Sequence, residues 1–323
     1  SKGCRHISLT SFILEVLERI LDVYIRGHFR DDLISKSQHA YIKGRSTETA
    51  LHEVVREIDS TMEHSQFTLA AFLDIEGAFN NVKVEAIIRS LRRLGVCDAV
   101  CDWISIMLCN IIIHHSKIGS SSLVRYATRG TPQGGVISPL LWLLVVNDIL
   151  LDIEASRLVK VVAYADDVVL LSSGLFTTTI SSCLGKALSR LSLGVNPDKT
   201  ELVLFTKRCK IPPFNTPVLE GKSLKLSSEA KYLVVVLDSK LNWNRNIEER
   251  VKKAHAAFYL CRGALGKSWG LSPKLTFWIL VAVVRPILIY GVLVWWTELL
   301  FKSKNSYSEM CRFLQIRRSY GCH

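Results

Sequence analysis

The sequence predicts a fold in which β-strands alternate with α-helices, either α/β or α+β, with a helical C-terminal third. Three observations lead to this prediction. Apolar runs of strand length lie between segments whose apolar residues recur at helical spacing, and only helical patterns follow residue 240. The 323 residues are also enough for a sizeable core and two or three domains.

Helical spacing is clearest over residues 47–64, where apolar residues recur at positions i, i+3, i+4, i+7 and i+11 after Ser46 or Thr47 as the N-cap. The same spacing predicts helices over residues 84–94, 98–108, 138–151, 180–194 and 247–258. Asp98 is the expected N-cap of its helix. Apolar runs predict strands over residues 66–75, 201–205 and 231–238, and two short strands around a turn within residues 159–173.

The apolar stretch from Leu275 to Trp296 is long enough to span a bilayer. Arg285 lies near its middle, however, where an arginine costs about 2.5–3.5 kcal/mol on membrane-insertion scales. Pro286 also divides the stretch into two shorter helices. Buried helices of a soluble domain are therefore the better interpretation, and no membrane contact is expected.

The chain is strongly basic, with 41 Lys and Arg against 29 Asp and Glu, a formal net charge of +12 and a pI near 9.3. This balance favours a polyanionic partner, nucleic acid first and an anionic membrane surface second. The nine cysteines are scattered and include no Cys-x-x-Cys pair, which indicates reduced thiols of an intracellular protein rather than a zinc site. Without an initiating Met or a signal peptide, the sequence is expected to be a piece of a longer polypeptide.

Two adjacent acidic residues, Asp166 and Asp167, interrupt the apolar run VVAYADDVVL. Strand interiors disfavour aspartate, so a tight turn is expected here, with both carboxylates at an exposed tip. Taken alone, the pair is explained by a polar hairpin turn, in which Asp is common.

Asp74 favours a functional interpretation of Asp166 and Asp167, because it ends a separate apolar strand in AAFLDIEGAFNNV. Strand ends that lie side by side in one sheet can share divalent cations, and Mg²⁺ prefers carboxylate and other oxygen ligands. Two such ions can activate an attacking 3′-hydroxyl and stabilise the leaving oxygen at phosphorus. Asp74 alone could equally be a strand-terminal cap, but together with Asp166 and Asp167 it predicts a catalytic carboxylate cluster.

The segment TRGTPQGGVISP, residues 128–139, is a loop that lies between these acidic positions in the sequence. Gly134 and Gly135 permit the backbone to approach a ligand closely, and Gln133 can hydrogen-bond a sugar or a phosphate. Pro139 opens the next helix. Because most glycine-rich loops are only turns, this segment supports a nucleotide site only in combination with the carboxylates.

In their order and spacing these segments resemble the reverse transcriptase domain of non-LTR (LINE-type) retrotransposons, with the arthropod jockey-like and rDNA-inserting elements nearest. The resemblance covers nearly the whole chain and is carried by CRHISLTSF, QHAYIKGRSTETALH, FLDIEGAFNNV, GTPQGGVISPLLW, AYADDVVLL, GVNPDKTELVLF, KYLVVVLD and LSPKLTFWILVAVVRPILIYGVLVWW. It implies an α+β fold, the right-hand polymerase, with fingers, an antiparallel-sheet palm and a helical thumb. Fingers and palm would interleave over residues 1–240, and the thumb and the start of a following connection would occupy residues 241–323.

The resemblance also implies a catalytic role for each matching residue. Asp74 and Asp166 would hold two Mg²⁺ ions, for which Mn²⁺ could substitute, helped by the backbone carbonyl of Ile75. Asp167 would be a secondary ligand or an electrostatic partner. Lys199, in NPDKTEL, would donate a proton to the departing pyrophosphate or stabilise its charge, and the alternative is a solvated surface lysine.

Four residues are implied in nucleotide binding. Phe79 matches the steric gate, a ring beneath the incoming sugar that excludes a 2′-hydroxyl, although an ordinary core aromatic would also fit its position. Gln133 and Gly134 would contact the incoming nucleotide, Gln133 at its sugar. Arg5 matches a fingers residue on the triphosphate, where a planar guanidinium suits phosphate oxygens.

Tyr232 and Leu233 match the primer grip, but two other positions depart from the family pattern. His6 stands where the family usually has Pro, and Val234 stands where the primer grip usually has Gly. A β-branched residue does not easily adopt a positive φ, although Val234 could simply continue the strand. The alternative function is therefore a degenerate, catalytically impaired copy that acts at most as an RNA-binding module.

The implied reaction is Mg²⁺-dependent transfer of a nucleotide from a dNTP to a primer 3′-hydroxyl, which copies RNA into DNA. The implied partners are an RNA template, a DNA primer, dNTPs and the rest of a Pol polyprotein with an upstream endonuclease, in the nucleus or the cytoplasm. A basic helix face is expected to follow the duplex backbone through Arg245, Arg250, Lys252 and Lys253. An RNA-dependent RNA polymerase shares the paired aspartates, but Phe79 argues against it.

Overall fold

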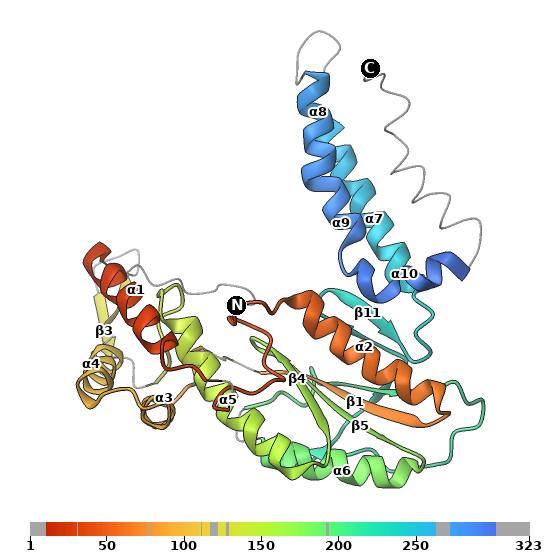
Figure 1. Ribbon diagram of the computed structural model, residues 1–323, viewed down its shortest axis with the longest axis horizontal. Coiled ribbons are helices and arrows are strands. Elements are labelled where there is room, and N and C mark those ends of the chain that lie inside the picture. Colours follow the sequence, from red (N-terminus) through yellow and green to blue (C-terminus); the bar gives the residue numbers. More distant parts are fainter. Residues whose placement is uncertain are drawn as a thin grey trace.

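A computed structural model describes residues 11–30, 32–75, 77, 79–110, 112–116, 122–126, 129–191, 194–262 and 272–301. Its centre is a five-stranded sheet with the strand order β4-β5-β1-β6-β9 (Figure 1). These strands span Phe67–Asp74 (β1), Lys160–Tyr164 (β4), Asp167–Gly174 (β5), Glu201–Phe205 (β6) and Leu226–Ser227 (β9). Helices alternate with these strands along the chain, which confirms the α+β class.

The sheet is mixed rather than purely antiparallel, which corrects the expectation for the palm. β1 pairs antiparallel with β5 and β6, and β4 with β5, but β6 and β9 run parallel. Between β6 and β9 the chain forms the small hairpin of β7 (Val218–Leu219) and β8 (Lys222–Ser223), and then returns to enter the sheet in the direction of β6. Another hairpin, of β2 (Ile112–Ser116) and β3 (Ser122–Tyr126), lies outside this sheet.

Both faces of the sheet are buried. Phe67, Leu69 and Leu73 of β1 belong to one core and Ala70 and Phe72 to the other, as expected for side chains that alternate along a strand. The first core is covered by α3 (Val84–Arg93), α4 (Asp98–Cys109), α5 (Ser138–Ser156) and α6 (Thr177–Arg190). The second core lies beneath α2 (Thr47–Glu63) and the C-terminal helices (Figure 1). Burial on both sides explains why β1 is apolar throughout.

The helix ends agree with the capping signals at α2 but not at α4. Ser46, rather than Thr47, is the N-cap of α2, and it forms a capping box with Thr49. At α4 the N-cap is Cys97, whose backbone is extended, so the prediction of Asp98 as the N-cap is wrong. Asp98 still favours this helix, since a negative charge in the first turn complements the helix dipole.

The N-terminal helix α1 (Phe12–Arg26) is attached to the rest of the fold through a buried carboxylate. Glu18 is fully buried, and its Oε2 accepts hydrogen bonds from the amide of Val136 at 2.6 Å and from the amide of Ile137 at 3.3 Å. These amides lie at the N-terminal end of α5, where unpaired N–H groups favour a negative charge. Glu18 therefore fixes α1 to the loop that precedes α5.

The outer edge of β4 is covered by the chain that precedes α2. The amide of Ala163 donates to the carbonyl of Ser37 at 2.9 Å, and the amide of His39 donates to the carbonyl of Ala163 at 2.8 Å. Gln38 is thereby bridged to Ala163 in parallel register. This short segment occupies hydrogen-bonding groups that an edge strand would otherwise present to solvent.

Residues 231–238 belong to a hairpin, which corrects the prediction of a single strand. β10 (Glu229–Tyr232) and β11 (Val235–Asp238) pair across a two-residue turn in which Leu233 has a φ of 45° and Val234 a φ of 69°. Positive φ at both central residues is typical of a type I′ turn, whose twist matches that of the paired strands. Val234 therefore reverses the chain instead of continuing it, at a position that favours glycine.

Arg250 supports this turn from α7 (Asn244–Arg262), so the prediction that it follows a duplex backbone is wrong. Its side chain is buried, donates a hydrogen bond to the carbonyl of Val234 and lies 4.8 Å from the ring centre of Tyr290. A carbonyl oxygen and an aromatic face are suitable partners for a guanidinium removed from water. Burial also lowers the pKa of Arg250.

The C-terminal helices project from the sheet, except the last one, which lies against α2 (Figure 1). After α7 they are α8 (Pro273–Ile279), the π-helical turn η1 (Leu280–Val284), α9 (Arg285–Ile289) and α10 (Val292–Phe301). The π-helical turn ends two residues before Pro286, which lacks the N–H that a regular α-helix needs. Within the described ranges, no helix combines the length and the apolar character needed to cross a bilayer. The domain boundary at residue 240 stays a prediction.

Replacing Val234 with glycine is expected to stabilise the protein. A residue held at an unfavourable positive φ is strained by about 1–3 kcal/mol, whereas glycine adopts this conformation readily. Glycine costs about 0.5–1 kcal/mol of backbone entropy, and little apolar burial is lost because Val234 is 48% exposed. Urea denaturation should show a free energy of unfolding that is higher by about 0.5–1 kcal/mol.

Val236→Gly is the matched control for this change, because Val236 is buried in β11 of the same hairpin and its φ is not positive. This control is expected to lower the free energy of unfolding. If Val234→Gly destabilised the protein as much as Val236→Gly does, strain at the turn would be contradicted.

Candidate active site

The antiparallel register of β1 and β5 brings the expected carboxylates together. Asp74, the last residue of β1, is paired directly with Asp167, the first residue of β5. Residues paired in this way have Cβ atoms about 4.5–5.5 Å apart on the same face of the sheet. Asp166 and Ala165 form the two-residue turn between β4 and β5, so Asp167 begins a strand instead of sharing the tip. Three aspartates therefore lie at one end of the sheet.

Lys199 lies beside Asp74 because the chain after α6 runs along the end of β1. Ile75 forms a β-bridge with Val195, and the amide of Asn196 donates to the carbonyl of Asp74 at 3.3 Å. A tight turn then places Lys199 Nζ 3.1 Å from Asp74 Oδ2. The side chains of this ion pair are 57% and 43% exposed, so a substrate can reach both of them.

The carboxylates influence one another electrostatically. The pKa of Asp167 is raised to about 6, first by burial of its carboxyl group and then by the negative charges of Asp166 and Asp74. Burial and neighbouring negative charge both disfavour the ionised form of a carboxyl group. A bound cation would reverse this effect, since it favours ionised carboxylates next to it.

A cleft of about 200 Å³ connects the carboxylates with the hairpin of β10 and β11. Asp74, Asp167 and Lys199 line one part of it, and Lys231 and Tyr232 line another. Of the two adjacent aspartates, Asp167 lines the cleft. The arrangement places negative charge for a metal ion and positive charge for phosphate groups within one small space.

The side chains of the predicted primer grip belong to the core. Tyr232 is 2% exposed and Leu233 is 8% exposed, and both are part of the second core. Burial raises the pKa of the Tyr232 hydroxyl above its ordinary value. The backbone of this hairpin and the exposed side chain of Lys231 remain accessible, whereas these two side chains do not. Primer contact stays a prediction.

The loop before α5 is held against the chain that follows β1. The amide of Thr131 donates to the carbonyl of Phe79 at 2.7 Å, and the amide of Gly130 donates to the carbonyl of Val82 at 2.8 Å. A Cβ at Gly130 would approach the carbonyl oxygen of Asn80 within 2.7 Å, so glycine is required for this contact. The loop and the residues after Asp74 therefore form one unit.

The predicted nucleotide-binding residues of this loop are accessible. Gln133 is half-buried, and Gly134 is exposed with a φ of 108°, a conformation that other residues rarely adopt. Phe79 is also half-buried and packs against the first core, with its ring centre 5.8 Å from that of Trp142. Contact with a nucleotide stays a prediction for all three residues. Arg5 and its neighbour His6 lie outside the described residues.

The donor set suits a hard divalent cation. Carboxylates from β1 and β5 face each other, and Mg²⁺ is commonly bound through one or two carboxylates, with water and phosphate oxygens completing its shell. Across the described part of the chain, no three His, Cys, Asp or Glu side chains already enclose a metal position. A divalent cation bound at this end of the sheet would therefore need further oxygen ligands beside the carboxylates.

Three residues around the site were not expected from the sequence. Glu18 is a lone acid on the buried stripe of α1, two turns before Ile25, and this position could have revealed it. Lys231 directly precedes the predicted primer grip. Trp142 gives no sequence signal, because it lies among the many apolar residues of α5. Its indole N–H donates to the carbonyl of Ala165 at 3.0 Å.

Residues 1–237 match the family model described as reverse transcriptase (RNA-dependent DNA polymerase). The chain belongs to the reverse transcriptase family. It is 25% identical over 310 residues to the probable RNA-directed DNA polymerase from transposon BS of Drosophila melanogaster, across 90% of this chain and 33% of that protein. The resemblance to retrotransposon polymerases is therefore confirmed.

Other relatives of this reverse transcriptase domain come from similar elements. The retrovirus-related Pol polyprotein from type-1 retrotransposable element R1 of Bradysia coprophila is 24% identical over 323 residues, across 98% of this chain and 32% of that protein. The RNA-directed DNA polymerase from mobile element jockey of Drosophila melanogaster is 25% identical over 308 residues, across 90% of this chain and 33% of that protein. The chain thus spans about a third of the length of these relatives.

Solved structures resemble this reverse transcriptase domain only distantly. An apo telomerase from Candida tropicalis, truncated from its C-terminal domain, matches with a TM-score of 0.48 and 11% identity over 70% of this chain and 44% of that chain. So low a similarity is no basis for inferring function.

Asp167→Asn is expected to raise stability at high pH but not at low pH. A carboxyl group whose pKa rises from 3.8 to about 6 on folding stabilises the fold fully below the lower value. That contribution falls between pH 3.8 and about 6, because the unfolded state has released its proton there while the folded state still holds it, and it is lost once the pH has risen through 6. Without Mg²⁺, the variant should melt at a higher temperature than the wild type at pH 8, and at the same temperature at about pH 3.

Asp102→Asn, on the exposed surface of α4, is the control for this pH profile. Its melting temperature should follow that of the wild type at both pH values. A difference between Asp167→Asn and the wild type that did not change with pH would contradict the electrostatic interpretation.

Proposed function

We propose that this chain is an active RNA-directed DNA polymerase, which transfers nucleotides from dNTPs to the 3′-hydroxyl of a primer. The observation that carries the proposal is the pairing of Asp74 with Asp167 beside Lys199, in a cleft that reaches the β10–β11 hairpin. Membership of the reverse transcriptase family supports it. Acidic, basic and primer-grip residues that are far apart in the sequence thus line one cleft.

The carboxylates are the proposed metal ligands. Reverse transcriptases use divalent ions, and we propose two Mg²⁺ ions here, with Mn²⁺ as a substitute. Asp74, Asp166 and the carbonyl of Ile75 are the proposed primary ligands, and Asp167 is the proposed neighbouring ligand. When bound, such ions lower the pKa of an attacking hydroxyl group and neutralise charge at phosphorus.

The remaining site residues are proposed to position the nucleotide. Lys199 carries three donors and a positive charge, which suits the leaving pyrophosphate, and it is already held at Asp74. Phe79 is the proposed selector against a 2′-hydroxyl. Gln133, Gly134 and Arg5 are proposed to contact the nucleotide, and the backbone at Tyr232 and Leu233 is proposed to contact the primer.

The family implies an RNA template and nucleotide substrates. A DNA primer, dNTPs and the rest of a Pol polyprotein with an upstream endonuclease are proposed in addition, since the chain spans about a third of its relatives. We further propose fingers and palm over residues 1–240 and a thumb over residues 241–323. An intracellular location, in the nucleus or the cytoplasm, agrees with the scattered cysteines.

A catalytically impaired copy that only binds RNA is the second candidate. The strained turn at Val234, with a φ of 69°, favours it, because the backbone of this hairpin is proposed to contact the primer. The presence of Asp74, Asp166 and Asp167 at one end of the sheet argues against it. The first proposal therefore has the stronger support.

Primer extension on an RNA template with dNTPs and Mg²⁺ tests the proposed function. We expect the wild type to extend the primer and Asp166→Ala to be slower by about 10²–10³-fold or more, since stabilisation of the developing charge is lost. Asp152→Ala, which removes an exposed carboxylate from α5, is the control and should retain wild-type activity.

Three outcomes would contradict this assignment. Equal extension by the wild type and Asp166→Ala would exclude the carboxylate cluster as the catalytic site. Extension by neither protein would favour the RNA-binding copy. Extension with rNTPs but not with dNTPs would favour an RNA polymerase.

Lys252→Gln is expected to weaken duplex binding and to reduce its salt dependence. A lysine that contacts one phosphate adds about 0.9 to the slope of log affinity against log salt concentration on B-form DNA. Arg245→Gln should change the slope less, because Arg245 Nε lies 3.8 Å from a carboxylate oxygen of Glu249 and 3.9 Å from one of Glu229. Fluorescence anisotropy with a labelled RNA–DNA duplex at several salt concentrations measures these slopes, and equal slopes for Lys252→Gln and the wild type would contradict the prediction.

A further inference from the structure

We infer that Trp142 is a positioning residue, which joins the ring of Phe79 to the turn that carries Asp166. The inference rests on the proposed function, because it assigns a role within the proposed active site. Trp142 lies on the second turn of α5 and is 1% exposed. A side chain so deeply buried cannot meet a substrate, so its effect on catalysis would have to pass through the residues that it contacts.

The first contact of Trp142 is its hydrogen bond to the turn. The indole N–H donates to the carbonyl oxygen of Ala165 at 3.0 Å. That carbonyl belongs to the peptide unit whose nitrogen is the nitrogen of Asp166, and a peptide unit is planar. A hydrogen bond that fixes this carbonyl oxygen therefore also fixes the orientation of the peptide plane between Ala165 and Asp166.

The turn needs support of this kind. Ala165 has a φ of 56°, in the left-handed region that residues other than glycine rarely adopt. The negative charges of Asp166 and Asp74 also act unfavourably on Asp167, which begins the strand directly after the turn. A hydrogen bond from a rigid helix of the core opposes both tendencies.

The second contact of Trp142 is with Phe79, the residue proposed to lie beneath the incoming sugar. The two ring centres are 5.8 Å apart, with an angle of 41° between the ring planes. Phe79 is fixed separately through its carbonyl, which accepts a hydrogen bond from the amide of Thr131 at 2.7 Å. One indole thus contacts both the proposed sugar-sensing ring and the proposed metal-holding turn.

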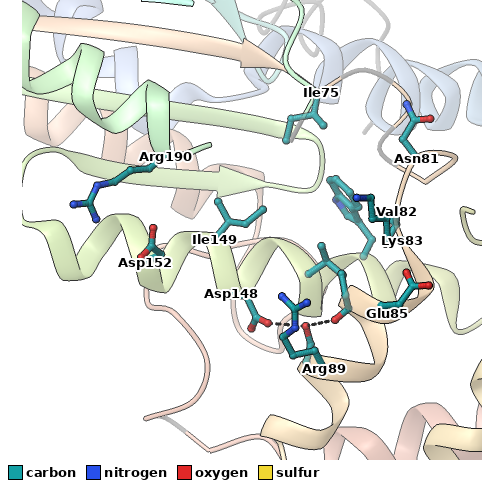
Figure 2. A pocket seen from close by; sticks show the side chains of 15 residues that line it. Ile75, Asn81, Val82, Lys83, Glu85, Arg89, Asp148, Ile149, Asp152 and Arg190 are labelled. Atoms are coloured by element: carbon teal, nitrogen blue, oxygen red, sulfur yellow. Dashed lines mark hydrogen bonds between the residues drawn. The ribbon is translucent and has the colours of Figure 1, made fainter. Parts of the chain in front are cut away.

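Trp142 also lies at the border of a cavity of about 480 Å³. Ile75 and Asn81 line one end of this cavity, and Asp152 and Arg190 line the other (Figure 2). The buried packing of the ring and its hydrogen bond to Ala165 together set the orientation of the indole.

Trp142→Phe tests the inference beside Trp295→Phe as a matched control. Trp295 is also fully buried, and its indole N–H donates to the carbonyl of Tyr290 at 3.3 Å in the C-terminal helices. Each substitution removes one indole N–H donor and keeps an aromatic ring, so both variants should show a similar decrease in melting temperature. Single-nucleotide incorporation on an RNA template and Mn²⁺ binding by electron paramagnetic resonance are then compared. Asp74→Asn, which should weaken Mn²⁺ binding most, identifies the site that is measured.

We expect Trp142→Phe to lower kcat and the affinity for Mn²⁺ by about fivefold each, the effect of one lost hydrogen bond, with KM for the dNTP changed by less than about twofold. Trp295→Phe should change none of these values. Trp142→Ala also removes the contact with Phe79, and should in addition reduce the preference for dNTPs over rNTPs by about tenfold.

Equal kcat and equal Mn²⁺ affinity for Trp142→Phe and Trp295→Phe would overturn the inference. A wild type that binds Mn²⁺ but extends no primer would overturn the proposed function, and the Mn²⁺ affinities would then decide the inference by themselves. A wild type that neither binds Mn²⁺ nor extends a primer would overturn both.

Discussion

The antiparallel pairing of β1 with β5 is the constraint on which the proposed active site depends. It sets Asp74 opposite Asp167, and the turn before β5 then places Asp166 next to them. A shift of this register by one residue would turn every side chain of a strand to the opposite face. The two buried cores prevent such a shift, because Leu69 and Ala70 would then have to exchange environments. The same apolar packing that stabilises the sheet therefore fixes the distance between its carboxylates.

Two strained turns flank the cleft, and both are supported in the same manner. Ala165 and Val234 have positive φ, and the carbonyl oxygen of each accepts a hydrogen bond from a buried side chain. The donors are Trp142 of α5 and Arg250 of α7, each held by a helix of the core. Strained backbone persists in proteins only where the surroundings hold it, and such positions gather at functional sites. The two turns thus depend on donors that lie outside the sheet itself.

Periodicity and the family blocks allowed most elements to be predicted, since helical and strand spacing are local properties. The hairpin at Val234 was missed because a run of β-branched residues resembles one strand, and no glycine marked its turn. The burial of Arg250 could not be predicted, because it depends on a hairpin that packs over one face of α7. Likewise, the sequence indicated that Asp74 and Asp167 belong together, but their register is set by tertiary packing. Lys199 was expected near pyrophosphate. Its ion pair with Asp74 depends on the bridge between Ile75 and Val195, a tertiary contact that local sequence patterns do not indicate.

The segment bonded to the edge of β4 has a consequence for how copies of the chain can associate. An open edge strand is a template on which a strand of another molecule can add and aggregate. Here Ser37 and His39 occupy both backbone groups of Ala163, in the strand that leads into the turn at Asp166. Another chain therefore cannot extend the sheet at that point.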